Sequence, residues 1–149
     1  MLSRHYRNLG RAALLRGDVQ AAVQALRACQ AQREKLPTRT LEARLTSADV
    51  AVQLAVALAR SGHADEARES ISPALRFLRE IERRNVDDQG QRLLLAQALY
   101  ASALSDPPQA KAALEEAQAL FNALPPDMRS ARTVRWWGER IGQAQRNTR

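Results

Sequence analysis

The chain has 149 residues and a formal net charge of +7, which comes from 23 basic and 16 acidic side chains. This length fits one domain with a real core, and the hydrophobic fraction of 45% excludes a chain that is disordered by composition. Alanine and leucine dominate the apolar residues, and the single cysteine, Cys29, excludes an internal disulfide framework or a multi-cysteine metal site.

Helical periodicity begins at the start of the chain. The first predicted helix ends at Gly17 and places four apolar side chains on one face, at Leu2, Tyr6, Leu9 and Ala13. Asp18 can cap the second helix, because its carboxylate can accept an unpaired backbone N–H of the first turn. The second helix is expected to end near Pro37, and its apolar face carries Val19, Val23, Leu26 and Cys29.

A third helix is predicted over residues 41–60, with Thr38 or Thr40 as its cap. It is apolar on several sides, which is typical of a helix packed between neighbours. Gly62 breaks it, and a fourth helix follows over residues 64–84.

Two further turn regions divide the second half of the chain. Pro73 lies inside the fourth helix, where its missing backbone N–H should kink the helix or restart it. Residues 85–90 form the next turn region, and a fifth helix rich in leucine and alanine follows. Pro107 and Pro108 are expected in the first turn of a sixth helix.

The sixth helix is expected to end at Leu124 and Pro125, and a seventh follows. The seventh carries one apolar stripe, formed by Val134, Trp137, Ile141 and Ala144. No alternating strand pattern competes with these helices, so the fold class is predicted as all-α, with about seven helices.

Three stretches of the chain share one pattern of a turn followed by small, large and small residues with identical spacing. Small residues let the two helices of a hairpin approach each other, and the large residue fills the groove between them. The three triplets are Ala22, Leu26 and Cys29; Ala67, Ile71 and Ala74; and Ala110, Leu114 and Ala117.

On these residues the chain resembles the tetratricopeptide repeat family. The first copy matches the family's signature best, through Tyr6, Leu9, Gly10, Gly17, Asp18, Ala22 and Leu26. The copies are 45 and 43 residues apart, whereas the family's unit is about 34 residues long, so longer helices are expected.

The resemblance implies a single TPR-like domain over residues 1–149, built as an array of antiparallel helix hairpins. The hairpins are expected at about 3–36, 40–84 and 88–124, with a capping helix at about 127–146. A plain helical bundle is the alternative architecture.

Catalytic and metal-binding patterns are missing from the sequence. It contains no HExxH, GxSxG, P-loop or dinucleotide-binding motif, and neither His5 nor His63 has a second ligand at suitable spacing. We therefore expect neither an enzyme nor a cofactor. Cys29 falls in a repeat triplet and is expected to be a buried small hydrophobe.

Charge is distributed unevenly along the chain. Residues 1–60 carry a net charge of +6, residues 61–127 carry −4 and residues 128–149 carry +5. In a linear array the two basic ends would be separate sites, unless the chain curves or dimerises. A homo-oligomer therefore stays an open alternative. The expected partner is a protein or peptide, and an acidic one is an option.

Two basic clusters are the candidate partner-binding residues. The first lies on the first helix and comprises Arg4, Arg7, Asn8 and Arg11. The second lies on the last helix, where Trp137 fits the apolar stripe and its neighbour is left partly exposed among arginines, a combination typical of interface hot spots. This second cluster comprises Arg132, Arg135, Trp136 and Arg140.

In the resembled family, the first helix of each hairpin lines a concave groove in which basic residues often bind peptide carboxylates. The later copies here offer other side chains at those places, so that carboxylate clamp is not carried over. These side chains are Asp49, Gln53, Arg60, Arg92 and Gln97.

The leading hypothesis is a non-catalytic protein-interaction module that binds a protein or peptide through its groove or its basic ends. A nucleic-acid-binding domain that uses the basic ends is one alternative, disfavoured by the acidic middle. A regulatory domain of a larger protein is another, because the array looks like tails of bacterial serine/threonine kinases and other signalling proteins.

The sequence predicts no membrane span and no signal peptide. The compartment stays open: the cytoplasm is favoured, and the periplasm applies if this is one domain of a membrane-anchored protein.

Overall fold

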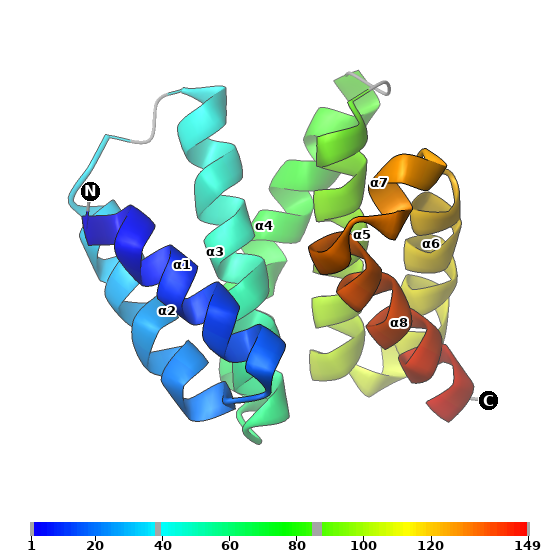
Figure 1. The fold of residues 1–149 in the computed structure, drawn as a ribbon, viewed down its shortest axis with the longest axis horizontal. Coiled ribbons are helices and arrows are strands. Elements are labelled where there is room, and N and C mark those ends of the chain that lie inside the picture. The colour runs from blue at the N-terminus through cyan, green and yellow to red at the C-terminus, as the bar shows by residue number, and fades with distance from the viewer. Residues whose placement is uncertain (1, 38–39, 85–87, 149) are drawn as a thin grey trace.

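In the computed structural model, which describes residues 2–37, 40–84 and 88–148, the chain is all-α, and no strand occurs within those ranges (Figure 1). The helices in chain order are α1 (Leu2–Arg16), α2 (Val19–Glu34), α3 (Leu41–Arg60), α4 (Ala64–Arg84), α5 (Gln89–Ser105), α6 (Ala110–Asn122), α7 (Pro126–Ser130) and α8 (Arg132–Asn147). A single 3-10 turn, Pro107–Gln109, leads into α6.

Three side-chain caps explain where helices begin. Asp18, Thr40 and Asp88 each accept the backbone N–H three residues further on, at 2.9–3.1 Å. The caps at Asp18 and Thr40 are as predicted, whereas Thr38 lies outside the described residues. Because Asp88 is a cap, α5 begins at Gln89, before the end of the turn region predicted over 85–90; residues 85–87 lie outside the described part.

Consecutive helices pack side by side as the pairs α1 and α2, α3 and α4, and α5 and α6. All nine residues of the repeated triplets are buried, and none has a relative exposure above 7%. Among the other contacts, α3 touches α1 and α5, which places these three helices next to one another. As its apolar pattern predicts, α3 is buried on several sides.

The last helix packs onto the end of this arrangement. Helix α8 contacts α6, and the Trp137 ring meets Tyr100 of α5 edge-on at 6.0 Å between centroids. Figure 1 shows α1 and α8 on the near side of the molecule, with α3 and α5 between and behind them. The two termini lie toward opposite ends of the long axis.

Three details of the sequence prediction differ from the structure. Leu2 and Leu9 are 57% and 48% exposed, because the buried stripe of α1, formed by Gly10, Ala13 and Leu14, shares only Ala13 with the predicted face. Of the two outcomes predicted at Pro73, a kink or a restart, the restart does not occur, because α4 runs through Pro73 as one helix. Pro73 is exposed, so water can reach the carbonyl that loses its intrahelical partner.

The third difference is at the C-terminal end. The predicted seventh helix is two helices, α7 and α8, because Ala131 has an extended backbone with ψ of 137°. The predicted stripe of α8 is otherwise confirmed, since Trp137 and Ile141 are buried and Val134 and Ala144 are half-buried.

Candidate functional site

A cavity of about 330 Å³ opens between α1, α3, α5 and α8. We call it the central cavity. Its volume lies at the lower end of the range for small-ligand pockets, about 300–1,000 Å³, and suits one or two side chains of a partner. Its polar lining comprises Arg11, Asp49, Gln53, Gln97 and Thr133.

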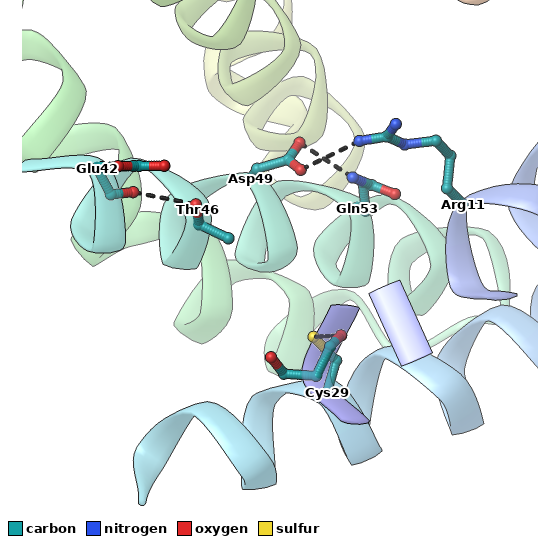
Figure 2. Close-up of polar contacts among 7 residues, drawn as sticks. Arg11, Cys29, Glu42, Thr46, Asp49 and Gln53 are labelled. Atoms are coloured by element: carbon teal, nitrogen blue, oxygen red, sulfur yellow. Dashed lines mark hydrogen bonds and ion pairs between the residues drawn. The ribbon is translucent and has the colours of Figure 1, made fainter. Parts of the chain in front are cut away.

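Three of these polar side chains form a connected group (Figure 2). The Gln53 amide nitrogen donates to Asp49 Oδ1 at 3.0 Å, and the Arg11 Nη2 faces Asp49 Oδ2 at 3.5 Å. Asp49 and Gln53 are one helical turn apart on α3, whereas Arg11 reaches across from α1. Asp49 is thus held firmly from its own helix and loosely from its neighbour.

Gln53 is the unusual member of this group. Its relative exposure is 3%, and its Oε1 is buried without a hydrogen-bond partner among the described residues. A buried polar atom that lacks a partner costs about 1–3 kcal/mol, so such an atom in a native core calls for an explanation. Its location in the lining of the central cavity supplies one, because a donor placed in the cavity would satisfy it.

The other side chains that line the central cavity are apolar. Leu14 of α1 and Trp137 of α8 are buried beside it, and four further apolar side chains complete the walls: Leu15, Leu93, Leu94 and Val134. The combination of an apolar wall with a few convergent polar groups is the general pattern of ligand-binding pockets.

A basic cluster continues the same surface beyond the cavity. The Arg60 and Arg140 guanidiniums lie 5.3 and 5.1 Å from the centre of the Trp136 ring, which is cation–π distance. Arg60 also donates to the Tyr100 hydroxyl at 2.9 Å, and the Trp136 and Trp137 rings meet edge-on at 5.0 Å. We call Arg60, Tyr100, Trp136 and Arg140 the basic rim.

The guanidiniums of the basic rim differ from the arginines that a carboxylate holds in place. Arg79 is held by two hydrogen bonds to the Glu116 carboxylate, at 2.8 and 3.0 Å, which raises the pKa of Arg79 above its ordinary value. Within the described residues, no carboxylate forms an ion pair with Arg60 or Arg140. Their charge is therefore available to a ligand.

The residues predicted as binding sites separate into two groups. Arg11, Trp136 and Arg140 lie at the central cavity or the basic rim. The other five are surface or partly buried side chains that do not line the cavity: Arg4, Arg7, Asn8, Arg132 and Arg135. Arg135 instead pairs with Glu139 of its own helix at 3.9 Å.

The structure also brings the two ends of the chain to one site. Arg11 of α1 and Thr133, Val134 and Trp137 of α8 line the same cavity. Residues from both terminal segments therefore line one cavity, although Arg11 is the basic residue among them.

Cys29 is buried, as predicted, and its Sγ donates to the Ser3 carbonyl at 3.1 Å (Figure 2). Burial raises the pKa of the Cys29 thiol above its ordinary value, with Arg33 and Arg7 opposing the shift.

Across the described ranges, no group of three or more His, Cys, Asp or Glu side chains is placed to hold a metal ion. None of the helices described is both long and apolar enough to cross a membrane.

Comparison with known proteins adds no relative: no family model, no curated protein sequence and no solved structure matches this chain.

Sequence reasoning reached several of these residues without knowledge of the site. Arg11, Trp136 and Arg140 were predicted as binding residues. The side chains that entered only through the family resemblance, because they do not reproduce its carboxylate clamp, are Asp49, Gln53, Arg60, Arg92 and Gln97. Tyr100 and Thr133 were missed, because no local pattern in the sequence indicates that Arg60 meets Tyr100 or that α8 lines a cavity with α1 and α3.

Proposed function

We propose that this chain is a non-catalytic interaction module that binds an extended segment of another protein in the groove between α1, α3, α5 and α8. The observation that carries this proposal is the central cavity, which combines apolar walls with a buried, unpartnered acceptor on Gln53. A side chain and a backbone amide of a bound segment would supply the missing contacts.

The distance between the central cavity and the basic rim supports a peptide rather than a small molecule. Asp49 and Arg60 lie on one face of α3, about 16 Å apart at 1.5 Å per residue. An extended chain covers that distance with about five residues at 3.3 Å each. A short segment can therefore contact both sites together.

The basic rim is suited to hold an acidic part of such a segment. Trp136 is half-buried and flanked by two guanidiniums that pair with no carboxylate among the described residues. Tryptophan and arginine are the residue types that most often dominate binding energy at interfaces. Stacking on the ring also fixes the arginine side chains in advance, which lowers the entropy lost on binding.

We further propose that the module is a tetratricopeptide-like repeat array. The burial of the repeated triplets and the contacts of α3 with α1 and α5 support this arrangement. In such an array, α1, α3 and α5 are the first helices of the hairpins and line one concave side.

The test uses a pool of capped heptapeptides of random sequence, added to the full chain labelled with ¹⁵N. We expect the Trp137 indole N–H resonance to shift on addition of the pool, because Trp137 lines the cavity. Thr133→Phe places a ring at the cavity from an exposed position and should abolish the shift. Gln143→Phe is the matched control, since Gln143 is exposed on α8 and does not line the cavity.

Two results would contradict the proposal. One is an unchanged Trp137 resonance with every concentration of pool. The other is an equal loss of binding in the Thr133→Phe and Gln143→Phe variants, which would place the peptide elsewhere.

A further inference from the structure

The acidic wall of the central cavity is held only loosely by its arginine. Asp49 is 22% exposed, whereas the Arg11 side chain that faces it is 47% exposed. Their separation of 3.5 Å exceeds the usual length of a charge-assisted hydrogen bond, about 2.7–2.9 Å. Exposed ion pairs of this kind contribute little, so Arg11 can leave Asp49 at small cost.

The same wall offers a second acceptor. The Gln53 amide nitrogen is committed to Asp49, which fixes the orientation of the amide and leaves Oε1 as the free acceptor. With Arg11 moved aside, the wall presents Asp49 Oδ2 and Gln53 Oε1 together. Two acceptors, one of them charged, call for a cationic group with several N–H donors.

The remaining walls suit the apolar stem that carries such a group in a side chain. Leu14, Leu94 and Trp137 line the cavity, and lysine and arginine hold their charged heads on apolar stems. We propose that the central cavity receives a lysine or arginine side chain of the bound segment, whose head group replaces Arg11 on Asp49 and donates to Gln53 Oε1. This inference rests on the proposed function, and it names the side chain by which the groove selects its partner.

A basic and an acidic side chain in the cavity predict opposite effects of the Arg11→Gln variant on binding. An acidic side chain in the cavity would need Arg11 and would be repelled by Asp49. A basic side chain competes with Arg11, so removal of that guanidinium should strengthen its binding. Arg11→Gln therefore separates the two cases by sign.

The test uses four pools of capped heptapeptides that are random except for the fourth residue, which is lysine, arginine, norleucine or glutamate. The signal is again the Trp137 indole resonance, followed to saturation in the full chain. We expect the lysine and arginine pools to bind at least about tenfold more tightly than the norleucine pool, as one charge-assisted hydrogen bond allows. The glutamate pool should bind more weakly than norleucine.

Two variants then connect this preference to the cavity. Arg11→Gln should raise the affinity of the lysine pool about threefold, because a weak competitor is lost. Asp49→Asn should remove the difference between lysine and norleucine. Arg27→Gln is the matched control: its side chain is 51% exposed, it pairs with Glu66 between two helices, and it does not line the central cavity.

The outcomes separate the inference from the proposed function. If the pools bind without preference, if glutamate is preferred, or if Arg11→Gln weakens the lysine pool, the inference is overturned while peptide binding stands. If no pool shifts the Trp137 resonance, both fail. Should Asp49→Asn unfold the chain, the sign of the Arg11→Gln effect still decides, because that half-exposed side chain can be replaced without disturbing the core.

Discussion

Gly10 should resist a substitution that usually stabilises helices. It lies inside α1, where replacing glycine with alanine ordinarily gains about 1 kcal/mol. Here a Cβ atom would lie 2.5 Å from Leu26 Cγ and 2.6 Å from Leu26 Cδ2. Leu26 has no exposed surface and belongs to the repeated core, so it has little room to move away.

The two effects can be weighed against each other. Overpacking of this kind costs about 1–3 kcal/mol, and the gain in helix propensity offsets about 1 kcal/mol of it. We therefore expect Gly10→Ala to lower the free energy of unfolding by about 1 kcal/mol, and the Tm by about 2–4 °C for a chain of this size. Thermal unfolding followed by far-UV circular dichroism measures both.

Gly142→Ala is the matched control. Gly142 also lies inside a helix, but its Cβ would meet only Arg146 Nη1 at 3.6 Å, an ordinary contact with a flexible side chain. It should raise the free energy of unfolding by up to about 1 kcal/mol. The same substitution is thus expected to have opposite signs at two positions.

Combining Gly10→Ala with Leu26→Ala tests whether the contact with Leu26 is the cause of the destabilisation. Leu26→Ala alone should cost about 2–5 kcal/mol, and Gly10→Ala added to it should be stabilising, since the atoms that clash are gone. If Gly10→Ala stabilised the wild-type chain as much as Gly142→Ala does, the close contact of α1 and α2 would be refuted.

Three further predictions concern the core and the basic rim. Ala67→Leu should lower the free energy of unfolding by about 1–3 kcal/mol in urea titrations, because Ala67 has no exposed surface; an unchanged midpoint would refute the repeat alignment. The Cys29 thiol should react with iodoacetamide only after unfolding. Because the folded state holds its proton more tightly, stability should fall as pH rises above 9, the ordinary thiol pKa, and this fall should disappear in Cys29→Ala. Trp137→Ala should cost about 3–5 kcal/mol of stability, whereas Trp136→Ala should cost less and weaken peptide-pool binding by more than about 1 kcal/mol, as titrations of both variants would show.

Local signals in the sequence were enough to place most helices. The caps at Asp18 and Thr40 depend on one side chain and the backbone of the next turn, so they can be predicted without knowledge of the fold. The repeated triplets were equally informative, since a small residue at fixed spacing is useful only where two helices touch. Ala22, Ala67 and Ala117 have no exposed surface at all.

Prediction was weaker where burial depends on which neighbours are present. Leu2 and Leu9 have the spacing of a buried stripe, yet they are exposed, because α1 is the first helix and the core packs against its other side. The break between α7 and α8 falls at Ala131, a residue with no intrinsic preference for an extended backbone. Tertiary packing sets the conformation there, and a local pattern does not report it.

The candidate site also combines features that the sequence indicates with features that depend on distant neighbours. The family resemblance implied groove-facing positions for Asp49, Gln53 and Gln97, but it gave no hint that only 3% of Gln53 would be exposed. The cavity that Gln53 lines also needs α8, which contributes Trp137, more than eighty residues further along the chain, to the wall.

The distribution of charge along the sequence did not predict which charged residues lie close together in the folded chain. The basic ends and the acidic middle suggest separate surfaces, yet Arg11 from one basic end meets Asp49, an acidic residue within that same basic segment. Near the other end, Arg140 shares the Trp136 ring with Arg60 of α3. What a ligand meets is the charge on one face of folded helices, so the cavity can favour a cation although the chain carries a net charge of +7.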